Sequence, residues 1–170
     1  YILLNSQRQH GGSQQWQMIR ATDEKATGAE ISTNGFTTTN WKEAIVPATV
    51  LTNLVEHGAY PEPYYGTNNK LSKNLIPDLA RVGREFYTYW FRTEVQIPSS
   101  FKGKHIWIEP EGINYRAEVW VNGYLMAQMA GMFNSQPIDI TDRVKAGERA
   151  TIAVRVYPVD VPGTSMPKSW

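Results

Sequence analysis

The clearest pattern in the chain is an alternation of apolar and polar side chains over residues 115–121. Side chains of a strand point to opposite faces with period two, so the pattern predicts a strand with one buried face. Asn122-Gly123 follows directly, and both residue types tolerate the positive φ that a type I′ hairpin turn requires. We therefore expect a hairpin whose second strand covers residues 124–129. The apolar side of the first strand consists of Tyr115, Ala117, Val119 and Val121.

Other segments supply the partners that this hairpin needs, because two strands alone cannot bury an apolar face. Apolar and polar side chains alternate clearly over residues 86–97, with the odd positions on one side. They alternate also over residues 150–157, with the even positions turned inward. Residues 105–109 form a shorter strand with Ile106 and Ile108 inward. Shorter apolar runs predict further strands at residues 1–4, 16–19 and 138–141.

The first half of the chain contains one clear helix signal. Thr49 or Thr52 can cap a short helix that ends near Gly58. Residues 21–40 are rich in Thr, Gly and Asn and lack periodicity, which predicts a long connection. Residues 41–45 form at most one turn of structure before Pro47.

The segment after this helix favours a loop. Residues 60–70 contain two prolines and a glycine, which exclude a central strand or a helix and predict a stiff, aromatic-rich loop. Residues 72–82 can hold a second short helix with Pro77 near its start.

Many short strands, frequent turns and little helix indicate an all-β fold, an antiparallel β-sandwich. The uneven loops favour a jelly roll. With 170 residues, 41% of them hydrophobic, the chain fits one domain. We assign residues 1–163 to this domain and residues 164–170 to the start of a linker toward further domains, because prolines and a glycine follow the last strand. The first residue is Tyr1, so we expect a mature or trimmed product.

Composition excludes several kinds of partner. Seventeen basic and sixteen acidic residues leave a net charge of +1, too little to attract nucleic acid or an anionic membrane. No apolar run is long enough to span a bilayer. The chain has no cysteine, and its histidines (His10, His57 and His105) lie far apart and have no acidic neighbours at ligand spacing. We expect no metal site, no cofactor, no nucleic-acid partner and no membrane partner.

The chain shows little sign of chemistry of its own. It lacks the Gly-x-Ser-x-Gly elbow of hydrolases and the phosphate loop of nucleotide-binding proteins. Glu109 and Glu111 form the obvious carboxylate pair, at a spacing of about 7 Å if the chain is extended. Pro110 and Gly112 indicate the end of a strand instead, where carboxylates are usually solvated.

Eight motifs that cover nearly the whole chain in order carry a resemblance to a known family. The motifs are Trp41, Val46-Pro-Ala-Thr-Val50, Tyr60-Pro-Glu-Pro-Tyr-Tyr-Gly-Thr-Asn-Asn69, Tyr89-Trp-Phe-Arg-Thr93, Gly112-Ile-Asn-Tyr-Arg-Ala-Glu-Val-Trp-Val-Asn-Gly123, Gly131-Met-Phe133, Ile138-Asp-Ile-Thr141 and Tyr157-Pro-Val-Asp-Val-Pro-Gly163. In this series the sequence resembles the N-terminal sugar-binding domain of family 2 glycoside hydrolases. The third and the last motif are most similar to the branch with exo-β-glucosaminidases and glycoprotein β-mannosidases, while β-galactosidases and β-glucuronidases are more distant.

The resemblance implies a galactose-binding-like jelly roll at the front of a retaining exo-β-glycosidase. An immunoglobulin-like domain and a (β/α)₈ barrel would follow, and the barrel would hold both catalytic glutamates, leaving no catalytic residue in this chain. The parent enzyme would hydrolyse terminal β-linked mannose, glucosamine or galactose, in the periplasm of a bacterium or outside the cell. The alternatives are an autonomous carbohydrate-binding module and a purely structural spacer.

The same resemblance implies a substrate-binding role for a few loop residues. Asn68 is similar to a pocket asparagine of related β-galactosidases, and Asp160 to an aspartate that binds sugar hydroxyls. Tyr64 and Tyr65 can stack on the apolar side of a sugar ring. The alternatives are that Asn68 only closes a turn and that the tyrosines only pack their loop.

Three residues on the polar faces of strands are expected to make contacts of a different kind. Trp120 is a candidate for packing against a following domain, or is a core residue if both faces of the sandwich are covered. Arg92 and Glu118 are expected to face outward and form a cross-strand pair.

Overall fold

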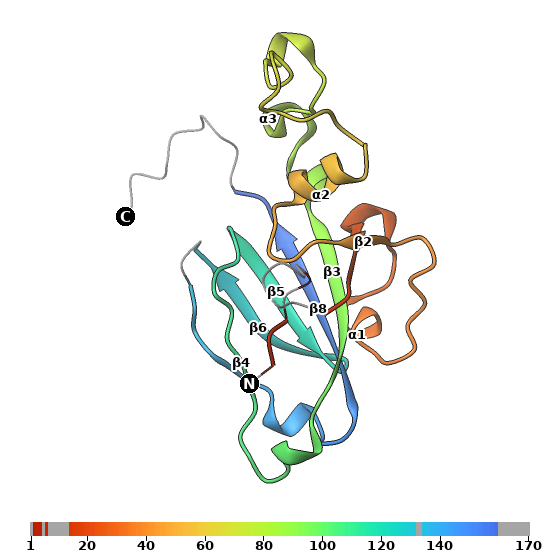
Figure 1. The fold of residues 1–170 in the computed structure, drawn as a ribbon, viewed down its shortest axis with the longest axis vertical. Coiled ribbons are helices and arrows are strands. Elements are labelled where there is room, and N and C mark those ends of the chain that lie inside the picture. The colour runs from red at the N-terminus through yellow and green to blue at the C-terminus, as the bar shows by residue number, and fades with distance from the viewer. Residues whose placement is uncertain (1, 5, 7–13, 132–133, 160–170) are drawn as a thin grey trace.

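The computed structural model describes residues 2–4, 6, 14–131 and 134–159 of the chain. Its centre is a six-stranded antiparallel sheet with the strand order β2-β1-β3-β8-β5-β6 (Figure 1). A second, two-stranded antiparallel sheet pairs β4 (Trp107–Ile108) with β7 (Ile138–Asp139). The strands of the large sheet are β1 (Trp16–Arg20), β2 (Lys42–Ala44), β3 (Tyr89–Gln96), β5 (Arg116–Val121), β6 (Tyr124–Ala130) and β8 (Arg149–Tyr157).

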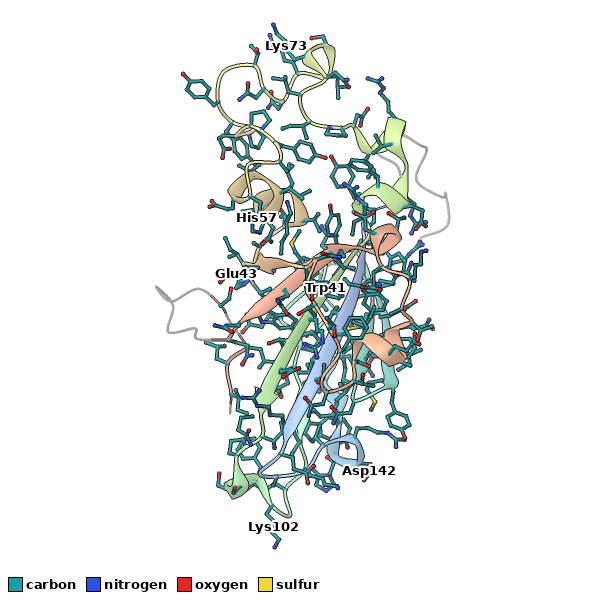
Figure 2. All side chains as sticks on the ribbon, turned by 90° about the vertical axis from the view of Figure 1, so that its right-hand side faces the viewer. Trp41, Glu43, His57, Lys73, Lys102 and Asp142 are labelled. Carbon is teal, nitrogen blue, oxygen red and sulfur yellow. The ribbon has the colours of Figure 1, made fainter. Side chains whose placement is uncertain are left out.

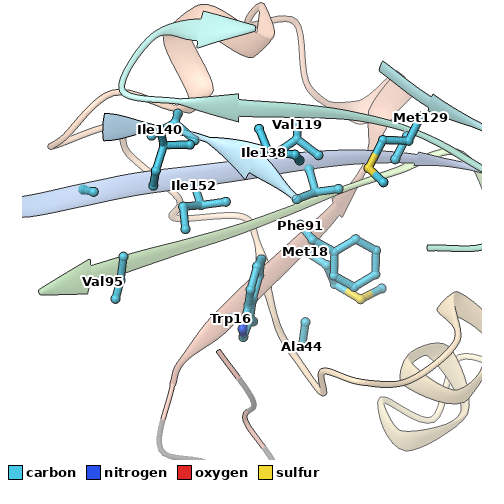
Figure 3. Packing of buried hydrophobic residues seen from close by; sticks show 14 of the residues in the cluster. Trp16, Met18, Ala44, Phe91, Val95, Val119, Met129, Ile138, Ile140 and Ile152 are labelled. Carbon is cyan, nitrogen blue, oxygen red and sulfur yellow. The ribbon is translucent and has the colours of Figure 1, made fainter. Parts of the chain in front are cut away.

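The main core lies between the two sheets, which confirms the all-β sandwich; its jelly-roll connectivity stays a prediction. Met18, Phe91 and Val119 of the large sheet are buried together with Ile138 and Ile140 from the β7 segment (Figure 3). The inward positions expected for residues 150–157 are part of this core, since Ala150, Ile152 and Val154 are buried and Val156 packs against them.

The predicted hairpin is confirmed, and it joins several parts of the domain. Asn122 and Gly123 connect β5 to β6 with φ of 47° and 90°, as a type I′ turn requires. The Asn122 side chain accepts a hydrogen bond from the backbone of Thr151 at 2.8 Å and donates one to the carbonyl of Arg143 at 2.6 Å. The Gly123 amide donates to the Ser32 hydroxyl at 3.0 Å. The turn therefore fixes β5 and β6 against β8 and against the segment before β2.

The second face of the large sheet is covered as well, by residues 21–41. This segment contains a 3₁₀ turn, η2 (Ala21–Asp23), and the one-turn helix α1 (Gly28–Ile31). A second buried cluster joins it to the sheet, and the cluster consists of Ile19, Ala21, Ile31, Trp41, Trp90 and Ala153. The expectation of a plain connection over residues 21–40 was therefore wrong, because this segment forms the outer layer of the second face.

Arg92 holds this outer layer on the sheet. Its side chain is 5% exposed, and its guanidinium donates to the carbonyls of Ile31 and Thr33 at 3.0 Å each. Glu94 completes the arrangement with a 2.6 Å ion pair to the same guanidinium. The guanidinium thus satisfies carbonyls at the C-terminal end of α1 that no helical amide can reach. The expected outward-facing pair of Arg92 with Glu118 was wrong, because β8 lies between their strands and the second face is covered.

The helix signal at Thr49 is confirmed. Helix α2 (Val50–Glu56) begins after Thr49, whose hydroxyl accepts from the Thr52 amide at 2.9 Å, and Gly58 follows its end with φ of 68°. No helix in the described ranges is long and apolar enough to cross a membrane.

Three further expectations differ from the structure or lie outside it. Residues 2–4 are not in a strand, although the Leu4 carbonyl accepts from the Trp16 indole at 3.0 Å. Residues 42–44 form β2 rather than a turn, because β1 offers them an edge. The expected linker at residues 164–170 lies outside the described residues.

Replacing Arg92 by methionine should lower the free energy of unfolding by about 3 kcal/mol, because two carbonyls and a carboxylate lose their buried partner. The matched control is Arg149→Met, which removes the 65% exposed arginine that contacts the other oxygen of Glu94 at 3.5 Å. This exposed pair should be worth less than about 1 kcal/mol. Urea unfolding of both variants gives the comparison. Equal losses in the two variants would contradict this role of Arg92.

Candidate functional site

The most prominent feature outside the sandwich is a projecting segment, residues 58–88, which we call the arm. It leaves the sheet after α2 and returns at β3, and it forms the upper end of the molecule in Figure 1. Its regular structure consists of η3 (Leu71–Lys73), α3 (Leu79–Val82) and η4 (Arg84–Tyr87). The prolines of its first part explain why no strand or longer helix forms there. Of the second short helix expected over residues 72–82, only α3 is present.

Short local bonds hold the arm in shape. The Tyr65 amide donates to the Glu62 carbonyl at 3.2 Å, and the Lys70 amide to the Thr67 carbonyl at 3.0 Å. Further along, the Arg81 guanidinium donates to the Asn74 side chain at 2.9 Å. These hydrogen bonds join residues close in sequence, so the arm is a series of turns that are held by local contacts.

Tyrosines attach the base of the arm to the core. Tyr60 and Tyr87 pack against the main core cluster, and the Tyr87 hydroxyl donates to the carbonyl of Pro77. Burial, followed by the neighbouring Tyr60 and Tyr89, raises the pKa of Tyr87 to about 12. The base of the arm is therefore partly buried against the main core.

The outer part of the arm exposes apolar side chains to solvent. Tyr64 is 91% exposed and Tyr65 is 77% exposed, which is unusual for aromatic residues that lie side by side. Single exposed apolar residues need no explanation, but a group of them on one segment indicates a contact surface. The large apolar side chains exposed on the arm are Tyr64, Tyr65, Leu71, Leu75 and Val82.

Asn68 lies beside these tyrosines and contributes to the loop itself. Its side-chain amide donates to the Glu62 carbonyl at 2.9 Å, and its backbone amide donates to the Tyr65 carbonyl at 3.2 Å. These two hydrogen bonds close the turn, as the alternative role of Asn68 predicts. The amide oxygen of Asn68 can still accept a bond from a sugar hydroxyl, so its substrate-binding role stays a prediction.

The remaining candidates are placed as follows. Asp160 lies outside the described residues. Glu109 and Glu111 are both exposed just after β4, which fits the solvated strand end that their flanking residues predict. The His57 ring lies 2.6 Å from the Glu43 carbonyl, and among the described residues it has no hydrogen bond to an acidic side chain. Within the ranges that the structure describes, no three His, Asp or Glu side chains could hold a metal ion.

Trp120 is partly buried and packs against the second cluster, because both faces of the large sheet are covered. Its indole lies against Gly28 of α1, where an added Cβ would come within 2.4 Å of the ring. Sequence reasoning missed α1 although its start carries a recognisable signal. Thr27 and Glu30 form a capping box, a Thr-x-x-Glu pattern that marks a helix N-terminus. A contact of Trp120 with a following domain stays a prediction.

Glu118 belongs to a small polar network beside Trp120. Its two carboxylate oxygens accept from the Tyr157 hydroxyl at 2.8 Å and from the Trp120 indole at 3.3 Å. The Arg155 guanidinium lies 5.1 Å from the Tyr157 ring centre and 5.6 Å from that of Trp90. Burial and the bond to Glu118 raise the pKa of Tyr157 to about 12. The network is part of the scaffold that positions β5 against β8.

Comparison with known proteins identifies the family of this chain. Residues 16–164 match the family described as "Glycosyl hydrolase 2 galactose-binding domain-like". The chain belongs to this family. Its relatives include the mannosylglycoprotein endo-beta-mannosidase of Lilium longiflorum, 36% identical over 90% of this chain and 16% of the relative. The exo-beta-D-glucosaminidase of Amycolatopsis orientalis is 26% identical over 90% of this chain and 14% of that protein.

Solved structures give the same result for the fold. The exo-chitosanase of Amycolatopsis orientalis superposes with a TM-score of 0.70 at 27% identity, over 87% of this chain and 16% of that structure. A β-D-mannosidase from Dictyoglomus thermophilum has the same fold, with a TM-score of 0.61. The chain thus spans about a sixth of the length of the relatives that it matches.

Stability at alkaline pH should depend on Tyr157. Its folded-state pKa of about 12 lies above the ordinary value of 10.0, so the folded state retains the proton that the unfolded state loses. The resulting stabilisation is complete below pH 10 and is lost as the pH rises toward 12. The pKa of Tyr87 is raised in the same way, so Tyr87 also contributes to this pH dependence. Tyr157→Phe should therefore make the unfolding free energy decline less steeply between pH 10 and pH 12, without abolishing the decline. Urea unfolding as a function of pH measures this, and identical declines in wild type and variant would exclude Tyr157 as a source.

Proposed function

We propose that this chain is the non-catalytic N-terminal domain of a retaining exo-β-glycosidase. In this proposal, the arm helps to form the wall of the pocket for the terminal sugar, and the sandwich supports a catalytic barrel elsewhere in the parent chain. Membership of the family and the share of its relatives that the chain spans support a domain within a longer glycosidase.

The exposed tyrosines carry the proposal. Tyr64 and Tyr65 are held on a locally hydrogen-bonded loop, and both residues are largely exposed to solvent. An aromatic ring packs well on the apolar face of a pyranose, and a loop that already has its shape loses little entropy on binding. The neighbouring Asn68 supplies an amide oxygen that accepts hydrogen bonds from hydroxyl groups.

The names of the relatives support a β-linked mannoside or glucosaminide as the substrate class. The Lilium longiflorum protein is named as an endo-β-mannosidase, whereas the Amycolatopsis orientalis protein is named as an exo-β-glucosaminidase. We favour the exo mode, because a projecting wall such as the arm closes a pocket around a chain end more readily than it lines an open cleft.

In the full-length chain, Tyr64→Ala combined with Tyr65→Ala should lower kcat/KM on a β-mannoside or β-glucosaminide by about tenfold or more, because each ring contributes about 1 kcal/mol of contact with the sugar. The free energy of unfolding should stay within about 0.5 kcal/mol of wild type, since both residues are exposed. Kinetic assays and urea unfolding on the same preparations measure the two quantities.

The control for this experiment is Tyr124→Ala. Tyr124 is a 53% exposed tyrosine of the hairpin, away from the arm. It should leave kcat/KM unchanged. An unchanged kcat/KM in the arm variant, or an equal loss in the control, would refute the proposed role of the arm.

A further inference from the structure

The sequence contains two Asn-Gly pairs, Asn34-Gly35 and Asn122-Gly123, which lie in opposite surroundings in the structure. In such a pair the chain can react with itself, because the backbone nitrogen of the glycine can attack the side-chain amide carbon of the asparagine. Glycine favours this attack, since it has no Cβ to shield its nitrogen and lets the backbone rotate. The two pairs are chemically equivalent, so a difference between them must come from the fold.

Asn34-Gly35 lies in an exposed turn shortly after α1. Both residues are exposed, and a Cβ added at Gly35 would meet no atom within 4 Å. Within the described part of the chain, neither the Asn34 side chain nor the Gly35 amide makes a hydrogen bond. The Asn34 side chain is thus free to turn toward the Gly35 nitrogen, which water and base can reach.

Asn122-Gly123, in contrast, is fixed by three hydrogen bonds. The Asn122 side chain accepts from the Thr151 amide at 2.8 Å and donates to the Arg143 carbonyl at 2.6 Å. The nitrogen that would attack is engaged as well, because the Gly123 amide donates to the Ser32 hydroxyl at 3.0 Å. The reaction at this pair would break all three bonds, so it has to wait until the hairpin opens locally.

We propose that Asn34 is a site of spontaneous deamidation and that the fold protects Asn122 from the same reaction. The Gly35 nitrogen loses its proton to a base in solution and bonds to the Asn34 side-chain carbon, which expels ammonia. Water then opens the resulting succinimide ring at either carbonyl, so the chain has lost ammonia and gained water. One opening gives aspartate. The other gives isoaspartate, in which the main chain runs through the side-chain carbons, and both products carry a new negative charge.

Isoaspartate at position 34 changes the turn that leads from α1 to the rest of the outer layer. The Thr33 carbonyl accepts from the Phe36 amide at 3.4 Å across this turn, and it also accepts from Arg92 at 3.0 Å. The added main-chain atom lies between the two ends that the first bond joins. The ring centres of Phe36 and Trp41 are 6.1 Å apart, and Trp41 lies against the large sheet (Figure 2). Deamidation of Asn34 therefore loosens the outer layer.

The site is tested by peptide mapping with mass spectrometry, after storage of the 170-residue chain at mildly alkaline pH. In the folded chain, Asn34 should deamidate at least about tenfold faster than Asn122, because the second pair must open before it reacts. In urea, where both pairs are accessible, the two rates should agree within about a factor of two. Equal rates in the folded chain, or an unchanged difference in urea, would overturn the proposal.

A pair of variants tests the effect on the outer layer. Storage should lower the urea midpoint of the wild type, whereas Asn34→Gln should keep its midpoint, because the longer side chain closes a ring much more slowly. The control is Asn40→Gln, since Asn40 is also exposed and also lies between α1 and β2. Its midpoint should fall on storage as in the wild type. An unchanged midpoint in the stored wild type, or an equal loss in stored Asn34→Gln, would overturn the link between Asn34 and the outer layer.

Discussion

The guanidinium of Arg92 is the contact on which the second layer of this domain depends. Helix α1 has a single turn, too short to be stable alone, and the carbonyls of Ile31 and Thr33 bind the arginine rather than water. With the helix fixed, Gly28 can lie against the Trp120 indole, and the polar side of the sheet becomes a second interior. The large sheet is thereby covered on both faces, whereas the arm keeps five large apolar side chains exposed.

Sequence reasoning succeeded where a local signal and the tertiary structure agree. The Asn122-Gly123 turn, the Thr49 cap and the alternation before Tyr157 each specify a structure that packing then reinforces. It failed for residues 21–40, because a one-turn helix has no periodicity and only its Thr27–Glu30 capping box marks it. Alternation also assumes one buried face, so Arg92 was expected to face solvent although that face is covered.

The candidate site was predictable in part for similar reasons. The prolines around Tyr64 and Tyr65 exclude regular structure, so an aromatic loop followed from the sequence, but its projection beyond the sheet depends on where α2 and β3 lie.

The most direct test of this account is hydrogen exchange, followed by mass spectrometry, of the 170-residue chain and of the full-length chain. In both proteins, the amides of residues 27–33 should exchange slowly, because the second layer belongs to the domain itself. Under the proposed function, the amides of residues 60–75 should exchange rapidly in the short chain and more slowly in the full-length chain, because the arm would border the sugar pocket there. Equal, rapid exchange of the arm in both proteins would contradict the proposal that the arm forms part of a pocket wall in the parent chain.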